Sequence, residues 1–406
     1  MNQLPCSFDL IIIGGGPAGV FAAIWAKTTY PHLSVLILEK SSRLLGKVQL
    51  SGGGRCNLTN INLNSRTVAS FYPRGSKELL GALTRWSPQD TMEWFESKGA
   101  GLKTEQEGRV FPATDQSQTI VNCLLTELDR LGIEIRFNQN IISVVKNRVG
   151  FLLQSEQGTV ECQKLILATG NSKEGYRWAE SLGHAIVSPV PSLFTFNISP
   201  FSLNELSGVS VNPVELKIDQ EIATQQGALL ITHYGLSGPA VLKLSAFHAR
   251  YLSDRNYQAN LFINWSPSRT EQQLFETLRM YKSDVPEQRL SSLNPFEFPK
   301  SLWQVLLSSQ TNKRLSDFSF KELKELSVRI HRDVYRINGK STHKDEFVTC
   351  GGVKTNEINF KSMESKICSN LYLIGELIDI DGVTGGFNLQ NGWTTGFIAG
   401  SNLLNS

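Results

Sequence analysis

The sequence predicts an α/β protein in which a discontinuous, doubly wound first domain is interrupted by a β-rich insert. Residues 8–40 follow the pattern of a β-α-β unit with a glycine-rich turn. Residues 164–170 are an apolar run that ends in small residues, residues 370–376 are one that ends in glycine and an acid, and both are typical of buried strands. Between them lie short predicted strands that differ from these buried apolar runs, so the first domain is expected to resume late in the chain.

The β-α-β pattern is complete. The apolar run FDLIII suits a strand buried on both faces, and Gly14, Gly16 and Gly19 follow it at once in the spacing G-x-G-x-x-G. A helix-compatible run, VFAAIWA, comes next, and a second apolar run ends in Glu39. A unit of about thirty residues with an acid about twenty positions past the glycines is typical of dinucleotide binding.

Each glycine has a separate task in such a site. Gly14 permits a tight turn, Gly16 lets a pyrophosphate approach the backbone, and Gly19 lets the helix pack close to the strand. The helix that begins at Pro17 and Ala18 points free N–H groups and a partial positive charge at the phosphates. The motif therefore predicts where the pyrophosphate of a dinucleotide binds.

The acid that ends the second apolar run completes the nucleotide site. Glu39 is expected to accept hydrogen bonds from the ribose hydroxyls of an adenosine, with Lys40 beside it. A membrane span or signal peptide is the alternative interpretation, because residues 10–26 are almost entirely apolar. Asp9, the lack of a basic segment before it and the Gly-Gly-Gly-Pro interruption argue against that alternative.

Composition narrows the class of protein. The chain has 406 residues, of which 40% are hydrophobic and 19% charged, as in a globular protein of two or three domains. A net charge of +3 is too small to indicate a nucleic acid or a membrane as partner, so a small-molecule substrate is expected. The six cysteines form no C-x-x-C pair, which favours reduced thiols in the cytoplasm. The six histidines show no metal-binding spacing, so no metal site is predicted.

A glycine-rich segment, SGGGRCNLTN at residues 51–60, follows the nucleotide motif. Glycine backbones can turn their N–H groups inward, so this segment predicts an anion or cofactor cradle, with a flexible surface loop as the alternative. Four residues in and before it are expected near the phosphates or the ring system of a bound cofactor: Lys47, Gly53, Arg55 and Asn57.

Cys56 lies between two of those residues. A neighbouring arginine and inward N–H groups favour a thiolate, which would make Cys56 redox-active. The alternative is a small buried residue that fills space beside the cofactor. No second cysteine lies at dithiol spacing, so the space-filling interpretation is preferred.

Two later buried strands lead to further predicted contacts: residues 164–170 end in small residues, and residues 370–376 end in glycine and an acid. In doubly wound folds this exit faces the ligand crevice. The predicted cofactor contacts at these strand ends and in the stretch 384–390 are Ala168, Thr169, Gly170, Gly375, Glu376, Gly386, Asn388 and Leu389. A final helix carries Gly392, Gly396 and Gly400 on one face, which predicts close helix packing, and its N-terminus is a further positive dipole end for a flavin.

Pro189 and Pro191 mark the start of the insert. The predicted division is one domain formed by residues 1–190 and 346–406, and another formed by residues 191–345 with a helical part near 266–330. Capping boxes at Ser268–Glu271 and Ser319–Glu322 predict helices over 268–281 and 319–330. His233 and Tyr234 interrupt the strands as candidate substrate contacts, although a structural role is preferred for the histidine.

Four stretches together carry a family resemblance: IIIGGGPAG, SGGGRCNLTN, HYGLSGPA and GELIDIDGVTGGFNLQ. The chain resembles, almost end to end, the BaiN/YhiN-like bacterial flavoproteins, described as aminoacetone-oxidase-family FAD-binding enzymes or NAD(P)/FAD-dependent oxidoreductases. The resemblance implies noncovalently bound FAD, a two-part Rossmann-like FAD domain and an inserted β-barrel-like domain with a small helical part. Many FAD proteins have Gly-Asp near the ribityl chain where this chain has Gly375 and Glu376, which leaves open whether Glu376, Asp379 or Asp381 takes that role.

The resulting expectation is an FAD-dependent oxidoreductase that acts on an unidentified small molecule. Only one G-x-G-x-x-G motif occurs in the chain, so no separate nicotinamide-binding domain is visible. NAD(P)H is therefore a candidate co-substrate that binds only transiently. The labels of two family members, aminoacetone oxidation and bile-acid ring reduction, disagree, so neither is transferred. Alternatives are an oxidase of small amines and a redox-sensing or interaction protein. The sequence assigns no catalytic residue and no oligomeric state.

Overall fold

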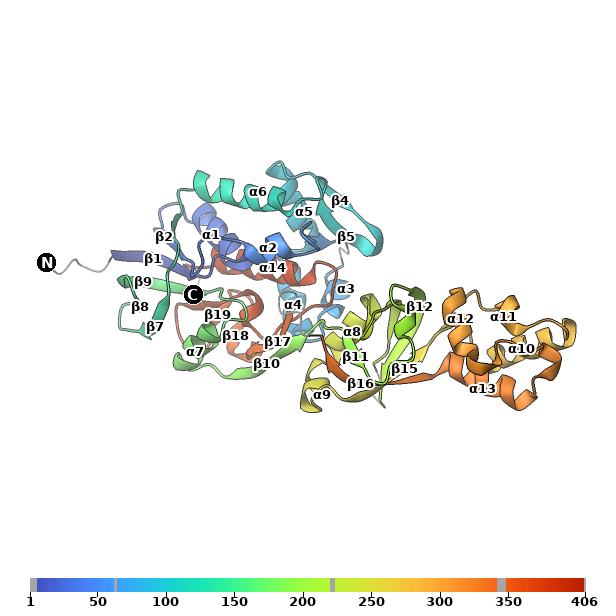
Figure 1. Cartoon of the computed structure of the whole chain (residues 1–406). Coiled ribbons are helices and arrows are strands. Elements are labelled where there is room, and N and C mark those ends of the chain that lie inside the picture. Colours follow the sequence, from blue (N-terminus) through green and yellow to red (C-terminus); the bar gives the residue numbers. More distant parts are fainter. Residues whose placement is uncertain (1–5, 62–63, 220–222, 342–347, 405–406) are drawn as a thin grey trace. The chain divides into compact units, whose positions relative to one another are not determined.

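A computed structural model of the chain describes residues 6–61, 64–219, 223–341 and 348–404. Its internal contacts divide the chain into two compact units. Unit 1 comprises Met1–Val190 and Val348–Ser406, and unit 2 comprises Pro191–Phe347 (Figure 1). The sequence predicts one boundary between residues 190 and 191, and the two units also divide there. The other predicted boundary, between residues 345 and 346, lies outside the described residues.

A parallel sheet forms the centre of unit 1. Its five parallel strands lie in the order β20 (Leu371–Leu373), β9 (Gly158–Leu167), β1 (Cys6–Ile13), β2 (Val35–Leu38) and β6 (Glu134–Arg136). The carboxyl ends of all five strands therefore meet at one edge of the sheet. β1 pairs with β2 on one side and with the much later β9 on the other, which makes this edge a topological switch point.

Two helices from opposite ends of the chain pack against one another in unit 1. Helix α1 (Pro17–Thr29) follows β1, and helix α14 (Phe387–Ser401) is the last helix (Figure 1). A Cβ atom added at Gly396 would lie 2.7 Å from the carbonyl oxygen of Ala18, and one added at Gly400 would lie 2.4 Å from that of Ala22. The predicted glycine face of the last helix is therefore a packing face against α1.

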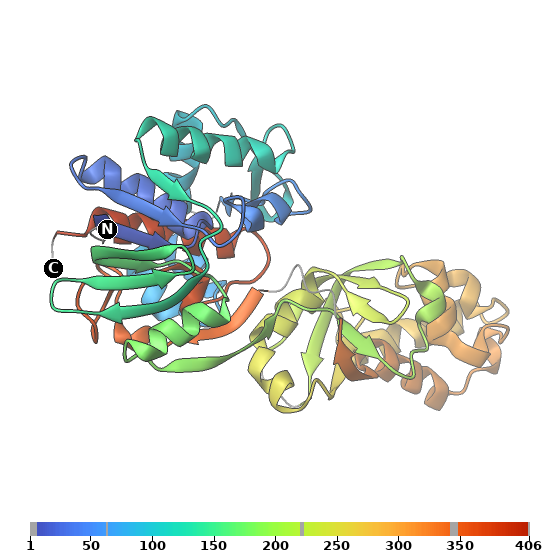
Figure 2. The same cartoon turned by 60° about the vertical axis from the view of Figure 1, so that its left-hand side comes forward.

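The remaining elements of unit 1 surround this sheet. The hairpin of β7 and β8 extends the sheet from β9 (Figure 2), and a small three-stranded sheet has the order β3-β5-β4. These elements are α2 (Gly46–Leu50), β3 (Thr59–Asn60), α3 (Ser65–Ser70), α4 (Ser76–Leu83), α5 (Pro88–Ser97), β4 (Leu102–Thr104), β5 (Arg109–Pro112), α6 (Ser117–Arg130), β7 (Ile141–Lys146), β8 (Phe151–Ser155), α7 (Lys173–Ser181), β10 (Ile186–Ser192), β17 (Val348–Val353), β18 (Ile358–Asn359) and β19 (Glu364–Ser365).

Unit 2 contains a closed barrel with a helical part. The barrel strands have the order β11 (Phe196–Ile198), β14 (Gly235–Ser237), β13 (Gln225–Ile231), β12 (Ser210–Ile218), β15 (Ala259–Asn264) and β16 (Asp333–Lys340). The helices of unit 2 are α8 (Pro239–Phe247), α9 (Ala249–Asp254), α10 (Glu271–Asp284), α11 (Leu290–Leu293), α12 (Lys300–Leu307) and α13 (Phe320–His331). The predicted fold class, a Rossmann-like domain with an inserted barrel and a helical part, is confirmed.

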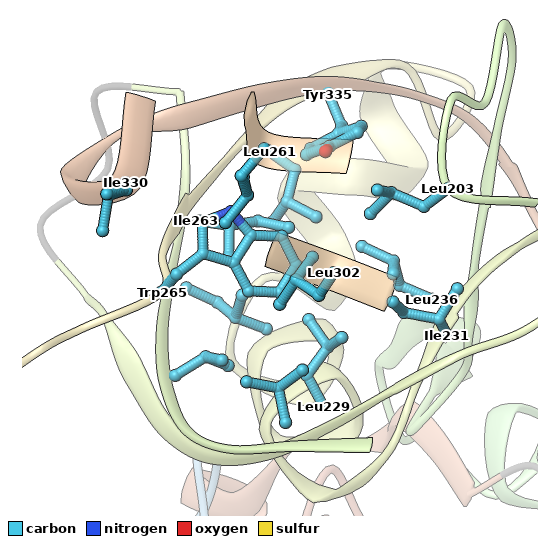
Figure 3. Packing of buried hydrophobic residues seen from close by; sticks show 14 of the residues in the cluster. Leu203, Leu229, Ile231, Leu236, Leu261, Ile263, Trp265, Leu302, Ile330 and Tyr335 are labelled. Carbon is cyan, nitrogen blue, oxygen red and sulfur yellow. The ribbon is translucent and has the colours of Figure 1, made fainter. Parts of the chain in front are cut away.

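One apolar core continues from the barrel into the helical part of unit 2. Leu261 and Ile263 of β15 and Leu302 of α12 belong to the same buried cluster (Figure 3). The buried carboxylate of Asp333 accepts hydrogen bonds from the indole of Trp265 at 3.0 Å and from the hydroxyl of Tyr335 at 2.8 Å. These bonds satisfy a charge that would otherwise be costly at the junction of barrel and helices.

Two expectations for unit 2 need correction. Helix α10 begins at Glu271 with Thr270 as its N-cap, because Thr270 and Gln273 form the capping box in place of the predicted Ser268 and Glu271. His233 is exposed in the β13–β14 turn, and the neighbouring Tyr234 is 79% exposed, so the preferred view of this histidine as a packed structural residue is wrong.

In the part of the chain that the structure describes, no helix is both long and apolar enough to cross a membrane.

The packing of α1 on α14 can be tested at Gly396. Gly396→Val should lower the free energy of unfolding by more than about 3 kcal/mol, because the new side chain meets backbone atoms that cannot move aside. Gly81→Val is the matched control, since a Cβ at that helical glycine meets nothing within 4 Å. Urea denaturation monitored by circular dichroism measures both, and equal stability of the two variants would contradict this packing.

Candidate functional site

The predicted site residues converge at the carboxyl edge of the parallel sheet. Backbone hydrogen bonds join the strand ends: the N–H of Gly14 donates to Leu38 at 2.9 Å, and the N–H of Ala168 donates to Ile13 at 2.9 Å. The N–H of Ile374 donates to Leu167 at 3.2 Å. Residues from four separate parts of the sequence thus meet at the place where doubly wound folds bind nucleotides.

The three motif glycines have different surroundings. A Cβ at Gly14 would lie 2.5 Å from the carbonyl oxygen of Ala168, and one at Gly19 would lie 2.0 Å from that of Gly14, so both positions require glycine for the turn itself. A Cβ at Gly16 meets nothing within 4 Å, and its extended φ of −78° is open to any residue. The space beside Gly16, at the N-terminus of α1, therefore fits the pyrophosphate of a dinucleotide.

The carboxylate of Glu39 is held in place at the end of β2. One oxygen accepts a hydrogen bond from the N–H of Gly15 at 2.7 Å, and the other accepts one from the N–H of Ser41 at 2.8 Å. These bonds fix the carboxylate beside the glycine turn, where a ribose could reach its remaining lone pairs. Lys40 lies at the surface, 3.9 Å from a carboxylate oxygen of Glu174.

The glycine-rich segment after the nucleotide motif is a tight turn. Gly52, Gly53 and Gly54 all have left-handed φ values, of 59°, 68° and 83°. Cβ atoms at Gly53 and Gly54 would meet nothing within 4 Å, which leaves open space beside this backbone. A cradle of the predicted kind needs both the left-handed turn and that space.

Arg55 has acidic partners in this structure. Its guanidinium donates to Glu105 at 2.7 Å and to Asp115 at 3.3 Å, and it lies 4.1 Å from the ring centroid of Phe111. The hydrogen bond from Arg55 lowers the pKa of the Glu105 carboxyl below its usual range. Arg55 was expected to direct its positive charge toward the cofactor, and in this structure two carboxylates of unit 1 pair with that charge.

Cys56 is a buried thiol. Burial raises its pKa to about 12, and a hydrogen bond with Ser51 lowers it only in part. Arg55 does not offset the burial, because its guanidinium is directed to Glu105 and Asp115. The thiolate interpretation of Cys56 is thus not supported, and the preferred space-filling interpretation agrees with the geometry.

The N-terminus of α14 is tied to the glycine-rich segment. With its amide oriented to satisfy both partners, Asn57 accepts from the N–H of Gly386 at 3.1 Å and donates to the carbonyl of Thr59 at 3.3 Å. Asn388 closes its own loop, because its amide group bonds the N–H and the carbonyl of Gly382, each at 2.9 Å. Leu389 is buried in the first turn of the helix. These side chains fix the helix end that is predicted to face the flavin.

Lys47 and Glu376, both predicted cofactor contacts, form an ion pair near Gly170. The ammonium of Lys47 also donates to the side chain of Asn171 at 3.2 Å, and Glu376 accepts from the N–H of Thr349 at 3.1 Å. Asn171 donates in turn to the hydroxyl of Thr349 at 3.0 Å. Sequence reasoning missed Asn171 and Thr349. The position of Asn171 directly after the Ala-Thr-Gly strand end was the available signal.

Three acids were open candidates for the ribityl chain, and their surroundings differ. Asp381 is fully buried and its carboxylate accepts from the guanidinium of Arg74, with an Nε–Oδ1 distance of 2.6 Å. Asp379 donates its backbone N–H to Val353 at 2.9 Å. Glu376 lies at the end of β20, so the geometry favours Glu376 over the buried Asp381 for contact with a bound group.

Buried polar atoms near the strand ends lack partners. Among the described residues, the hydroxyl of Thr169, the hydroxyl of Tyr176 and the side-chain oxygen of Asn391 are buried without a hydrogen bond. Burial, with a smaller contribution from the charges of Glu376 and Asp379, raises the pKa of Tyr176 above its usual range. Unpaired buried groups are costly, so they are candidate contacts for a bound cofactor.

A βαβ nucleotide turn, open space beside Gly16 and an acid held at the end of β2 define a dinucleotide-binding domain of the Rossmann type. The chain belongs to the family described as the HI0933-like protein Rossmann domain, whose model matches residues 8–402. This match confirms the family resemblance seen in the sequence.

The chain is similar to characterised proteins over its whole length. It is 31% identical to a ribosomal RNA dihydrouridine synthase of Escherichia coli (strain K12), covering 98% of both chains. It is 29% identical to the protein of that description from Haemophilus influenzae, covering 95% of this chain and 96% of the relative. It is 27% identical to a 3-dehydro-bile acid delta(4,6)-reductase of Clostridium scindens, covering 96% and 97%.

Solved structures share the fold at low sequence identity. A 3-ketosteroid-delta4-(5alpha)-dehydrogenase from Rhodococcus jostii RHA1 superposes with a TM-score of 0.53 at 14% identity, covering 99% of this chain and 98% of that one. A 3-ketosteroid delta1-dehydrogenase from Sterolibacterium denitrificans gives a TM-score of 0.52 at 13% identity, covering 98% and 99%. At this level of identity, the similarity shows a shared fold and nothing about function.

Gly16 offers a test of the cofactor site. Gly16→Val should lower FAD affinity at least about a hundredfold, about 2.8 kcal/mol, because the side chain enters the space that the pyrophosphate requires. The fold should persist, since that space holds no protein atoms within 4 Å. Equilibrium dialysis with FAD and a thermal melt of the apoprotein measure the two effects, with Gly81→Val as control. Normal FAD binding by Gly16→Val would place the phosphates elsewhere.

Cys56 offers a second test. Cys56→Ser should retain FAD and change turnover less than about tenfold, because a buried thiol with a pKa near 12 is a poor nucleophile at neutral pH. Flavin content and the rate of reduction by NAD(P)H or dithionite provide the measurements. A loss of a hundredfold or more in turnover, with FAD still bound, would instead make Cys56 catalytic.

Proposed function

We propose that this protein is an FAD-dependent reductase of a carbon–carbon double bond conjugated to a carbonyl group, and that its substrate is uridine in ribosomal RNA. The observation that carries the proposal is the end-to-end similarity to ribosomal RNA dihydrouridine synthases of two organisms. Both relatives match the cofactor unit and the insert alike, since 95–98% of this chain is covered.

The names of the relatives share one kind of chemistry. Formation of dihydrouridine saturates the C5–C6 bond of uracil, which is conjugated to the C4 carbonyl. A delta(4,6) 3-dehydro-bile acid has two double bonds, C4=C5 and C6=C7, both conjugated to the 3-keto group, and its reduction saturates one of them. In uracil a hydride adds to the carbon β to the carbonyl and a proton adds to the α carbon. In the dienone the hydride adds to the equivalent electron-poor carbon, β or δ to the carbonyl, and the proton adds to the neighbouring α or γ carbon. A conjugated enone or its uracil equivalent is therefore the common substrate class.

The residues of unit 1 bind and orient the cofactor in this proposal. The N–H groups at the start of α1 and the open backbone at Gly16 bind the pyrophosphate, and Glu39 binds the adenosine ribose. Glu376 and Lys47 lie at the end of the crevice assigned to the ribityl chain. When bound, FAD supplies the hydride, with NAD(P)H as the proposed source of the two electrons.

The proposal departs from the expectation that no nucleic acid is a partner. That expectation rests on the net charge of +3, which describes the sum of the charges and not their distribution. An RNA substrate also agrees with the cytoplasmic location proposed from the cysteines. A small-molecule enone remains the second candidate substrate, because the bile-acid reductase is covered as completely as the RNA-modifying relatives.

Complementation tests the proposed substrate. Expression of this chain in an E. coli strain that lacks its own ribosomal RNA dihydrouridine synthase should restore dihydrouridine in ribosomal RNA, measured by mass spectrometry of nuclease fragments. Gly16→Val should fail to restore it, which ties the modification to the cofactor site. Absence of dihydrouridine with a folded, FAD-containing protein would contradict the proposal. NAD(P)H consumption that depends on a 3-keto-4,6-diene steroid would then favour the second candidate.

A further inference from the structure

We infer that one outer face of the barrel in unit 2 is an RNA-binding surface that contacts the phosphates of the substrate. The inference deepens the proposed function and rests on it for the identity of the RNA. The basic face is formed by β12, β15, β16 and the residue that follows α13. Its members are Lys217, Asn260, Phe262, Arg332, Val334 and Arg336.

Strand register places these side chains on one face. Phe262 pairs with Lys217 of β12 on one side and with Val334 of β16 on the other, so these three residues form one row across the sheet. Asn260 pairs with Arg336 in the next row. Leu261, Tyr335 and Ile337 alternate with them and are buried in the barrel core. Because side chains alternate along a strand, the basic face points away from that core.

The side chains of this face are accessible. Asn260, Arg332 and Arg336 are exposed, and Val334 is 53% exposed. Lys217 and Phe262 are half-buried. Val334 lies in sequence between Arg332 and Arg336 and keeps the surface between these two charges apolar.

The cations of this face are available for a ligand. Within the described residues, Lys217, Arg332 and Arg336 have no carboxylate partner. Two acids, Glu215 of β12 and Asp219 directly after that strand, alternate with Lys217, and both have neutral partners: Asp219 accepts from the N–H of Asn260 and Glu215 accepts from the side chain of Gln226. Three cations therefore share this face with two acids, and a net positive charge remains.

Arg332 is held in a fixed position. Its guanidinium lies 4.5 Å from the ring centroid of Phe262, and its backbone N–H caps the end of α13 by donating to Val328 at 2.7 Å. Stacking on an aromatic ring leaves the edge N–H groups of an arginine free to bind a phosphate. Less side-chain entropy is then lost when the anion binds.

The spacing favours a polymer over a single anion. Val334 and Arg336 are alternate residues of β16, about 6.6 Å apart, and Arg332 directly precedes that strand. The two arginines are therefore spread along the strand direction and do not converge on one pocket. A row of cations matches the regularly spaced charges of a nucleic acid backbone, and each contact releases bound counterions from the RNA. Charge complementarity therefore favours RNA as the ligand of this face. Ribosomal RNA is the substrate proposed above.

The test removes the three charges together. The triple variant Lys217→Gln, Arg332→Gln, Arg336→Gln should raise the Kd for a fluorescein-labelled 20-residue uridine oligomer about tenfold or more at 100 mM KCl. The slope of log K against log salt should also fall by about 2, as expected for three contacts with single-stranded RNA. Fluorescence anisotropy measures both quantities on the FAD-loaded, full-length protein.

The matched control removes three other exposed cations of the same unit. Arg279→Gln, Lys300→Gln and Lys321→Gln change the net charge equally but lie in the helical part, so RNA affinity should stay within about threefold of the native value. Flavin content and NAD(P)H-driven flavin reduction should be unchanged in both variants. Equal losses of affinity in the two triple variants would overturn the inference.

Other outcomes separate this inference from the proposed function. Absence of RNA binding by the native protein, or native affinity in the first triple variant, would overturn the inference even if dihydrouridine is formed. Loss of affinity in that variant supports it even if the native protein forms no dihydrouridine, in which case only the proposed function fails. Loss of binding to phosphatidylglycerol vesicles with unchanged RNA affinity would assign the face to a membrane and overturn it.

Discussion

The close approach of α1 to α14 is the constraint on which unit 1 depends. The N-terminal and C-terminal parts of the chain meet there, and Gly396 and Gly400, at two successive turns of α14, let the two backbones approach closely. Gly19 brings the same helix against the turn that ends β1. The free N–H groups of α1 are aimed at the crevice because the helix is held on both sides. The proposed phosphate site is thus shaped by backbone packing at the N-terminus of α1.

The loops around the crevice are fixed by polar groups that are paired inside the protein. Asp381 is fully buried with Arg74, and removal of either partner would leave an uncompensated charge. Asn57, Asn388 and the Lys47–Glu376 pair join segments that are distant in sequence. Several of the polar residues near the cofactor site therefore act mainly by shaping its walls.

Local patterns were sufficient to predict the β-α-β unit and the glycine packing face. They also predicted helix α13, whose N-cap is Ser319, because its signals lie within a few residues. The partners of Arg55 could not be predicted in this way, since Glu105 and Asp115 are 50 and 60 positions away and no spacing rule connects them. The raised pKa of Cys56 depends on tertiary burial, which outweighs the basic neighbour that the sequence shows. The basic face was missed because its residues come from three separated strands and the net charge averages them out.

The insert begins and ends on neighbouring strands. The chain leaves unit 1 along β10 and re-enters it along β17, and these two strands pair with one another. Two crossover points that are adjacent in space bracket an entire barrel with its helices. Recombination at those points exchanges the insert as a single cassette and leaves the redox half of the gene product intact. A lineage can in this way acquire a new substrate while it inherits its cofactor chemistry unchanged.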